Sequence, residues 1–397
     1  VGQYKGSAKE QLANFNESLH NYFPTLKWKT LASWQEAFVQ LRDGLLSLKT
    51  VQKKVVFIDE LPWLASHKSG FLSAFSHFWN AYASEMPNII VIICGSAASW
   101  IIDKVVNDKG GLHNRITKRI RLLPLTLKET KEYLGHKNIR YEHYELLQLY
   151  MIIGGIPAYL NEVKRGRSVA QNIDAICFSK DGLLAGEFDN LYAALFNAPE
   201  NHIQVIQALA KKNKGLTRAE IVSASGIMTG GTLTKVLNEL TQSGFIEKTY
   251  PIGKKEKDSV YMLADEFSLF YFRFMKQHAT FEKEQWLSLQ SSAAYRSWCG
   301  YAFENICIKH VAQIKQALQI GGIYSRSSSW VFKGDKDRMG AQIDLLIERA
   351  DNIINICEVK YSNKPFTIDK KYHNELQEKI RVFRQESGAQ KSILFTF

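Results

Sequence analysis

The sequence has few cysteines and prolines, no long apolar run and no low-complexity tract. The chain has 397 residues, with eight prolines and five cysteines, Cys94, Cys177, Cys299, Cys307 and Cys357. No two cysteines form a C-x-x-C pair, which argues against a disulfide framework and against a structural zinc site. No apolar stretch approaches the roughly 18 residues of a membrane-spanning helix. The start, VGQYKGSAKEQ, does not resemble a signal peptide, so we expect a cytoplasmic protein without a membrane partner.

Positive charge is in excess. Lys and Arg number 51 against 39 Asp and Glu, which gives a formal net charge of +12. A basic balance favours an anionic partner, and DNA is the partner that we expect. With 45% hydrophobic residues the chain can form real cores, and its length predicts about two to four domains.

The first chemical signal is an acidic pair after a short apolar run. Val55–Ile58 reads as a buried strand, and Asp59 and Glu60 follow it directly. In open α/β sheets, ligands bind at the carboxyl ends of the strands. An acid at that position can hold the Mg²⁺ ion of a nucleotide, and the next acid can polarise an attacking water. The alternative is an ordinary strand that ends in a solvated acidic turn.

The surrounding pattern predicts a parallel sheet. Capping-box signatures at Ser7 and Ser33 predict two helices, and a further helix is expected over about 71–83. A second apolar run, Ile89–Cys94, ends in Gly95-Ser96. Strand, helix and strand at this spacing indicate a βαβ crossover. We also expect a short strand over Arg119–Leu123.

The middle of the chain reads as helical and then as a winged helix-turn-helix. Periodicity from about 127 to 196 is interrupted at Gly154-Gly155-Ile156-Pro157. Three short helices and a hairpin follow, and the third helix, over 231–243, is the one that usually enters the major groove of DNA. The residues that we expect to contact DNA are Lys235 in that helix and Lys254, Lys255 and Lys257 in the wing. The alternative is a module that only packs or contacts protein.

The sharpest chemistry lies near the C-terminus. Two apolar strands, 342–347 and 353–357, are separated by a polar turn and predict a hairpin. Asp344 lies on the first strand, and Glu358 and Lys360 on the second point to one face because side chains alternate along a strand. Two carboxylates suit Mg²⁺ or Mn²⁺, and the lysine can stabilise charge on a phosphate. Glu304, on a preceding helix, is an accessory candidate.

These residues resemble the PD-(D/E)xK nuclease family, which has the restriction-endonuclease-like fold. The matching positions are Asp344, Glu358 and Lys360, with Glu304 in the helix before the hairpin and Gln342 just ahead of Asp344. The resemblance implies that Asp344 and Glu358 bind the metal. Many domains of this fold bind nucleic acid or merely fold, without cleaving it. An exposed hairpin with a solvated ion pair is the remaining alternative.

The whole chain resembles the archaeal-type ATPase family of the AAA+/STAND group, which are P-loop ATPases with a winged helix and a nuclease-like domain. VVFIDELPWL resembles the Walker B segment, which implies Asp59 for Mg²⁺ and Glu60 for water activation. The resemblance implies a sensor role for Ser96 and a phosphate-sensing role for Arg115. It places Pro157, in the GGIPAYL segment, near adenine.

One element of that family is missing from the sequence. No G-x-x-x-x-G-K-[ST] motif occurs. We expect that the phosphate-binding loop belongs to a segment before Val1, removed by a chain boundary, proteolysis or a misplaced start. Without the loop and its lysine, this chain should bind ATP poorly and hydrolyse little.

The resulting prediction is an α/β multidomain protein. Its parts are a partial P-loop NTPase core with a parallel sheet (1–126), a helical lid (127–197), a winged helix-turn-helix (198–276) and a restriction-endonuclease-like α/β domain (285–397), with a linker over 277–290. We expect an ATP- and Mg²⁺-dependent switch associated with DNA. The alternatives are a metal-dependent endonuclease with a regulatory ATPase core, and a non-catalytic interaction scaffold with vestigial sites. A homo-oligomer is compatible with each.

Overall fold

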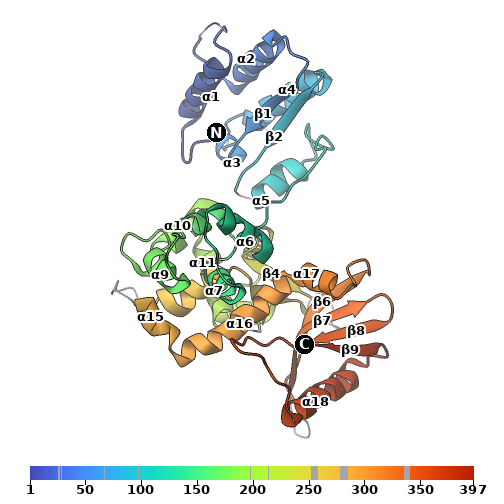
Figure 1. Cartoon of the computed structure of the whole chain (residues 1–397). Helices are drawn as coiled ribbons and strands as arrows, with labels where there is room; N and C mark the ends of the chain where they lie inside the picture. Colours follow the sequence, from blue (N-terminus) through green and yellow to red (C-terminus); the bar gives the residue numbers. More distant parts are fainter. Residues whose placement is uncertain are drawn as a thin grey trace. The chain divides into compact units, whose positions relative to one another are not determined.

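The computed structural model has a mixed α/β architecture with parallel and antiparallel sheets (Figure 1). It describes residues 1–397 apart from 26, 28, 67, 97, 197, 213, 252–257, 278–284 and 335–339. The chain forms two compact units, unit 1 over Val1–Arg121 and unit 2 over Leu122–Phe397. In the part of the chain that the structure describes, no helix is long and apolar enough to cross a membrane.

Unit 1 is built around two parallel strands. Its elements are α1 (Ala8–Tyr22), α2 (Trp34–Ser47), β1 (Lys54–Ile58), α3 (Leu61–Leu64), α4 (Phe71–Ala81), β2 (Ile89–Ile93) and α5 (Ala98–Ile101). β1 and β2 pair in parallel from Lys54 opposite Ile89 to Ile58 opposite Ile93. The predicted βαβ crossover is therefore confirmed, but the prediction of a buried strand is wrong at Val55 and Phe57, which are exposed, while Ile58 is buried.

The helices of unit 1 begin where their caps predict. Ser7 forms a complete capping box with Glu10, and the Ser33 side chain accepts a hydrogen bond from the Glu36 N–H. An aromatic cluster then joins α2 to α4, with Trp34 and Phe71 ring centroids 4.7 Å apart. This cluster forms the core that holds β1 in place.

The prediction of a strand over Arg119–Leu123 is wrong. That segment is irregular in the structure, and Ile120, Leu122 and Leu123 are strongly exposed. A strand needs a neighbour to accept and donate its backbone hydrogen bonds, and no strand in the described residues pairs with this segment.

Unit 2 starts with a helical region. Its helices are α6 (Leu127–His136), α7 (His143–Ile153), α8 (Pro157–Asn161), α9 (Val169–Ile173) and α10 (Glu187–Leu195). The predicted break is confirmed, because α7 ends at Ile153 and α8 begins at Pro157. Gly154 has a φ of 63°, and a Cβ on Gly155 would lie 1.9 Å from the Leu125 carbonyl oxygen. The chain crosses itself here, and only glycine fits.

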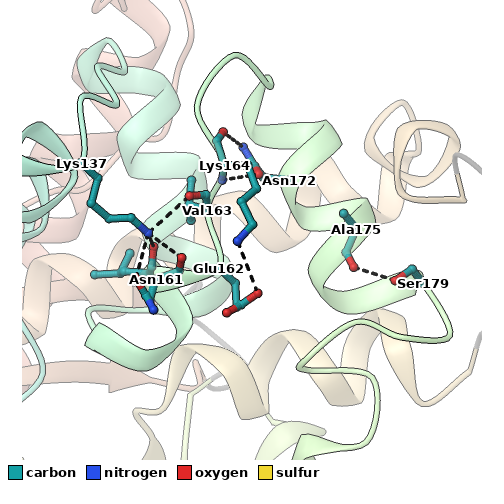
Figure 2. A network of polar contacts seen from close by, with 9 residues as sticks. Lys137, Asn161, Glu162, Val163, Lys164, Asn172, Ala175 and Ser179 are labelled. Atoms are coloured by element: carbon teal, nitrogen blue, oxygen red, sulfur yellow. Dashed lines mark hydrogen bonds and ion pairs between the residues drawn. The ribbon is translucent and has the colours of Figure 1, made fainter.

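A lysine holds the end of α8 (Figure 2). The Lys137 ammonium donates to the backbone carbonyl of Asn161 at 2.5 Å and to its side-chain oxygen at 3.1 Å. Asn172 bridges the next loop by accepting from the Lys164 N–H and donating to the Lys164 carbonyl. Cations and amides near a helix end satisfy its free carbonyl groups, so this network fixes α8 against α6 and α9.

The next elements match the order predicted for a winged helix. They are α11 (Glu200–Ala210), β3 (Leu216–Thr217), α12 (Arg218–Ser225), α13 (Gly231–Gln242), β4 (Ile246–Thr249) and β5 (Val260–Leu263). The three strands form an antiparallel sheet in the order β3-β5-β4. Residues 252–257 lie outside the described residues.

The prediction of a linker over 277–290 is wrong for its described end. Its described end forms α15 (Gln285–Gln290), whose Trp286 is fully buried. Trp286 stacks on Phe178 at 5.7 Å and meets Phe270 edge-on at 4.9 Å. Phe270 ends α14 (Glu266–Phe270), which continues as a π-helical turn over Tyr271–Met275. One aromatic side chain thus anchors a stretch whose composition is polar.

The last part of unit 2 is a four-stranded sheet between helices (Figure 1). Its elements are α16 (Ala293–Lys309), α17 (Val311–Ala317), β6 (Ser325–Phe332), β7 (Ala341–Arg349), β8 (Ile353–Cys357), α18 (Lys370–Ser387) and β9 (Ser392–Thr396). The order is β6-β7-β8-β9, with β9 parallel to β8 and the other pairs antiparallel. Val382 and Phe383 of α18 cover one face, and residues of α17 cover the other.

Candidate functional site

The acidic pair in unit 1 lies at one edge of the parallel sheet. Asp59 and Glu60 follow β1, and Cys94 and Ser96 follow β2. The Ser96 hydroxyl donates to Glu60 Oε2 at 3.1 Å, and the Ser96 N–H donates to the same oxygen at 3.3 Å. Parallel strands place their carboxyl ends at one edge, and Ser96 therefore contacts the acid pair directly; the sensor role that the resemblance implies for Ser96 stays a prediction.

The backbone around Glu60 has an unusual conformation. Glu60 has a φ of 51° and a ψ of 49°, in the left-handed region. Non-glycine residues in such conformations cost of order 1 kcal/mol or more and occur often at functional sites. The Leu61 N–H donates to the Cys94 carbonyl at 2.9 Å, and a Cβ on Gly95 would lie 2.6 Å from Pro62. These close contacts hold the turn after β1 against the end of β2.

Asp59 has one oxygen engaged and one available. Its Oδ1 accepts from the Cys94 thiol at 2.7 Å and from the Glu60 N–H at 2.9 Å. Burial, followed by the bond to Asp59, raises the pKa of Cys94 to about 11, so the thiol stays protonated and acts as the donor. Oδ2 accepts no hydrogen bond within the described residues. A carboxylate oxygen in this state fits the oxygen preference of Mg²⁺.

The other residues predicted to contact the nucleotide are Arg115, in unit 1, and Pro157, in unit 2. Arg115 is exposed after a turn and forms no ion pair within the described part of unit 1. Pro157 occupies the first turn of α8 in unit 2, and the two units are separate bodies. Both roles stay predictions.

The second cluster lies at the end of the β7–β8 hairpin. Leu345 pairs with Cys357, so the next position along the hairpin sets Asp344 opposite Glu358. Asp344 lies on the same face of β7 as Leu346, which packs in the core under α18. Its Oδ2 accepts from the Val359 N–H at 3.2 Å. The prediction that pairing brings Asp344 beside Glu358 and Lys360 agrees with this geometry.

Glu358 is almost fully buried and is surrounded by donors. Its side chain lies 2.8 Å from the Lys379 ammonium and 3.0 Å from that of Lys360, and it accepts from the Tyr372 hydroxyl at 2.8 Å. Burial acts to raise the pKa of Glu358, but the bonds from Lys379 and Tyr372 outweigh it and the pKa is lowered. Glu358 is therefore a carboxylate at neutral pH.

The neighbouring acids shift in the opposite direction. Burial, followed by the charge of Glu358, raises the pKa of Asp344. Burial, followed by the charge of Asp344, raises the pKa of Glu304 on α16 to about 7. Burial opposes the charged form of Lys360, yet its bond to Glu358 outweighs burial and raises its pKa. The cluster thus pairs a charged Glu358 with acids that hold protons more strongly than usual.

The donor set at this cluster fits a cation only in part. Among the described residues, no three His, Cys, Asp or Glu side chains lie close enough to hold a metal ion. Gln342 donates to Asp344 Oδ1 at 3.3 Å, and Lys379 contacts both oxygens of Glu358 at 2.9 and 2.8 Å. A divalent ion bound by Asp344 and Glu358 would compete with the Lys379 ammonium for Glu358.

Lys379 and Tyr372 were missed by the sequence prediction. Both lie on α18, seven residues apart, so they share a face of the helix two turns apart. Asp369 caps this helix by accepting from the Tyr372 N–H at 2.7 Å. The cap and the spacing of seven were visible in the sequence, but nothing in it linked α18 to the hairpin.

Lys235, the residue of α13 that is predicted to contact DNA, has an acidic neighbour. Lys235 is 74% exposed in its side chain and lies 3.9 Å from Glu239. Glu239 also contacts His202 Nε2 at 2.8 Å. The wing residues Lys254, Lys255 and Lys257 lie outside the described residues.

Comparison with known proteins gives similarities in sequence and in structure. No family model matches the chain. An uncharacterized protein of Methanocaldococcus jannaschii, MJECL04, is 25% identical over 377 residues, which are 94% of this chain and 80% of that protein. The Walker-type ATPase PABY2304 of Pyrococcus abyssi aligns with a TM-score of 0.46 and 20% identity, covering 67% of this chain and 77% of that one. The functional assignment rests on the geometry of the two clusters.

Proposed function

We propose that the protein is a nucleotide-binding protein of the ATPase type that acts on DNA. The observation that carries the nucleotide part is the acidic pair after β1, with Glu60 held by Ser96 from the end of β2. An acid pair with a polar partner at the carboxyl ends of parallel strands is the arrangement that P-loop ATPases use for magnesium and water.

Asp59, Glu60 and Ser96 have different roles in this proposal. Asp59 would hold Mg²⁺ through Oδ2, and the ion when bound neutralises phosphate charge. Glu60 would orient and polarise the attacking water, and Ser96 keeps the Glu60 carboxylate in place. Because the sequence has no G-x-x-x-x-G-K-[ST] motif, we expect weak nucleotide binding and little hydrolysis by this chain.

Nucleotide titration tests the proposal. Fluorescent ATP is titrated into the chain with Mg²⁺, and into Asp59→Asn and Glu60→Gln. We expect weak, Mg²⁺-dependent binding that Asp59→Asn removes and Glu60→Gln retains, because only Asp59 is assigned to the ion. Absence of binding to the parent chain would contradict the proposal, as would binding insensitive to Asp59→Asn.

A second candidate function is metal-dependent cleavage of DNA at the hairpin cluster. The observation that favours it is the placement of Asp344 opposite Glu358, with Lys360 3.0 Å from Glu358. The two acids would hold Mg²⁺ or Mn²⁺, and Lys360 would stabilise charge on the phosphate. Glu304 would assist as an accessory acid.

A plasmid assay tests cleavage. Supercoiled plasmid is incubated with Mg²⁺ or Mn²⁺ and the parent chain, Glu358→Gln, or the control Glu375→Gln, which changes an exposed acid on α18. We expect nicking that needs the metal, is lost in Glu358→Gln and is retained in the control. Nicking that persists in Glu358→Gln, or no nicking at all, would argue against cleavage at this cluster. The nucleotide-dependent switch and the non-catalytic scaffold would then remain as functions.

We also propose that α13 and the wing contact DNA. Lys235, Lys254, Lys255 and Lys257 supply the positive charge, and phosphate contacts of this kind weaken with salt. Changing the three wing lysines to Glu should lower DNA affinity at low salt. Unchanged affinity would favour a packing role for these elements.

A further inference from the structure

An open groove of about 950 Å³ lies in unit 2, and no residue of α13 is among its described lining residues. It is bounded by the end of α11, the turn after α14 and the first half of α16. Its lining includes basic residues from the first two of these segments, Lys211, Lys212, Lys214, Arg273 and Lys276. We refer to it as the basic groove.

The charge of the basic groove is of one sign. No Asp or Glu is among its described lining residues, and none of the five cations forms an ion pair with another described residue. Lys276 lies over the Phe272 ring at 5.1 Å, a contact that leaves its charge intact. Leu269, Trp298 and Tyr301 form the floor and are buried, so a ligand would be held mainly by the exposed cations. Unpaired cations in a concave wall concentrate positive potential.

The basic groove lies next to Glu304, the accessory acid of the hairpin cluster. Tyr301 lines the groove, and Glu304 follows it by three residues on α16. Residues three apart on a helix are neighbours on its surface. Lys214 also acts on Glu304, since its charge is among those that lower the pKa of that acid against the effect of burial. The groove and the cluster therefore adjoin along α16, because Glu304 lies one turn from Tyr301 and its charge interacts with that of Lys214.

We propose that the basic groove binds the phosphate backbone of DNA and delivers it to the cluster formed by Asp344, Glu358 and Lys360. The inference rests on the proposed action on DNA and names its binding surface. A row of cations beside two carboxylates and a lysine suits a polyanion whose phosphodiester enters the cluster. Because the floor is buried, the contacts are to phosphates, and binding should depend strongly on salt and little on sequence.

Charge removal tests the basic groove. In EDTA, anisotropy of labelled single-stranded and duplex DNA is measured with the parent chain and with a quadruple variant, Lys211→Gln, Lys214→Gln, Arg273→Gln and Lys276→Gln. We expect affinity to fall by more than about tenfold at about 50 mM salt, and the slope of log affinity against log salt to lose about 0.7 to 0.9 per cation removed. A double control, Lys128→Gln and Lys180→Gln, changes exposed lysines outside the groove and should bind as the parent does.

A second measurement does not depend on the folding of a variant. Acetylation of the parent chain, followed by mass spectrometry, should show that DNA protects Lys211, Lys214 and Lys276 but not Lys128. Parent-like affinity and slope in the quadruple variant, or groove lysines that stay reactive with DNA bound, would overturn the inference. Metal-dependent cleavage that persists without groove-dependent binding would retain the proposed function and reject the groove. Groove-dependent DNA binding without cleavage would retain the groove as a DNA-binding surface and reject cleavage at the cluster, the second candidate function.

Discussion

At the scale of single residues, Glu358 is the centre of the hairpin cluster. Three donors converge on a carboxylate that is 3% exposed, and two of them, Lys360 and Lys379, are cations. A buried charge is tolerated only when such partners compensate for the lost hydration. The same partners determine how easily a metal ion can reach it.

Removal of Lys379 should therefore strengthen metal binding. Lys379→Gln takes away the ammonium 2.8 Å from Glu358 and leaves a carboxylate that attracts a divalent ion more strongly. We expect tighter Mn²⁺ binding, by about tenfold, in calorimetric or spin-resonance titration. Lys371→Gln, an exposed change on the same helix, is the control. Equal or weaker Mn²⁺ binding in Lys379→Gln would show that the ion does not bind at Glu358.

Glu304 should make stability depend on pH. Its pKa is raised, by burial first and then by the charge of Asp344, from an ordinary value of 4.5 to about 7. Between these values the folded protein holds a proton that the unfolded chain releases, so the free energy of unfolding falls as pH rises.

Urea unfolding at pH 5 and pH 8 measures this effect. Glu304→Gln cannot titrate, so its loss of stability between the two pH values should be smaller than that of the parent by about 1–2 kcal/mol, since solvent screens part of the charge of this half-buried group. The exposed change Glu375→Gln should leave the parent's pH dependence intact. An equal loss in Glu304→Gln would rule out the shifted titration.

Part of this cluster could be predicted from the sequence alone. Strand alternation and a polar turn were enough to set Asp344, Glu358 and Lys360 on one hairpin, because register follows from local pattern. The same reasoning could not predict that Tyr372 and Lys379 contact Glu358. Their role depends on how α18 packs on the sheet, through Val382 and Phe383, which is a long-range contact.

At the scale of elements, the break between α7 and α8 is a close crossing of two backbone segments. The Leu125 N–H donates to the Gly155 carbonyl at 2.8 Å, and a side chain at Gly155 would meet the Leu125 carbonyl. The glycine is thus required by its surroundings rather than by its own φ angle.

Two glycine substitutions should have opposite effects. Gly155→Ala forces two backbones apart and should lower the free energy of unfolding by about 3 kcal/mol. Gly135→Ala, in α6, meets nothing within 4 Å and should raise it by about 0.5–1 kcal/mol, because alanine loses less conformational freedom in a helix. Chemical denaturation followed by circular dichroism compares them. A tolerated Gly155→Ala would contradict the crossing.

Element prediction succeeded where local signals were sufficient. The caps at Ser7 and Ser33 correctly predicted where α1 and α2 begin. The glycine pair that starts at Gly154 correctly predicted where α7 ends. It failed over Arg119–Leu123, where apolar residues had no strand to pair with. It failed again at Trp286, where burial of one side chain by distant aromatics outweighed a polar composition.

At the scale of the whole molecule, the two clusters lie in separate units. Unit 1 carries the acids assigned to a nucleotide's magnesium, and unit 2 carries the basic groove and the hairpin cluster. A nucleotide alters DNA binding only if it favours one state of the protein over another. A non-catalytic scaffold with vestigial sites would differ in this respect, because a nucleotide would not change its DNA affinity.

The most direct test measures DNA affinity of the entire chain with and without saturating MgATP, in the parent and in Asp59→Asn. Coupling between two sites usually changes affinity by about 5- to 150-fold. The account predicts a shift in the dissociation constant for DNA of at least about fivefold in the parent and none in Asp59→Asn. A dissociation constant that MgATP leaves unchanged in the parent, or changes equally in Asp59→Asn, would contradict it.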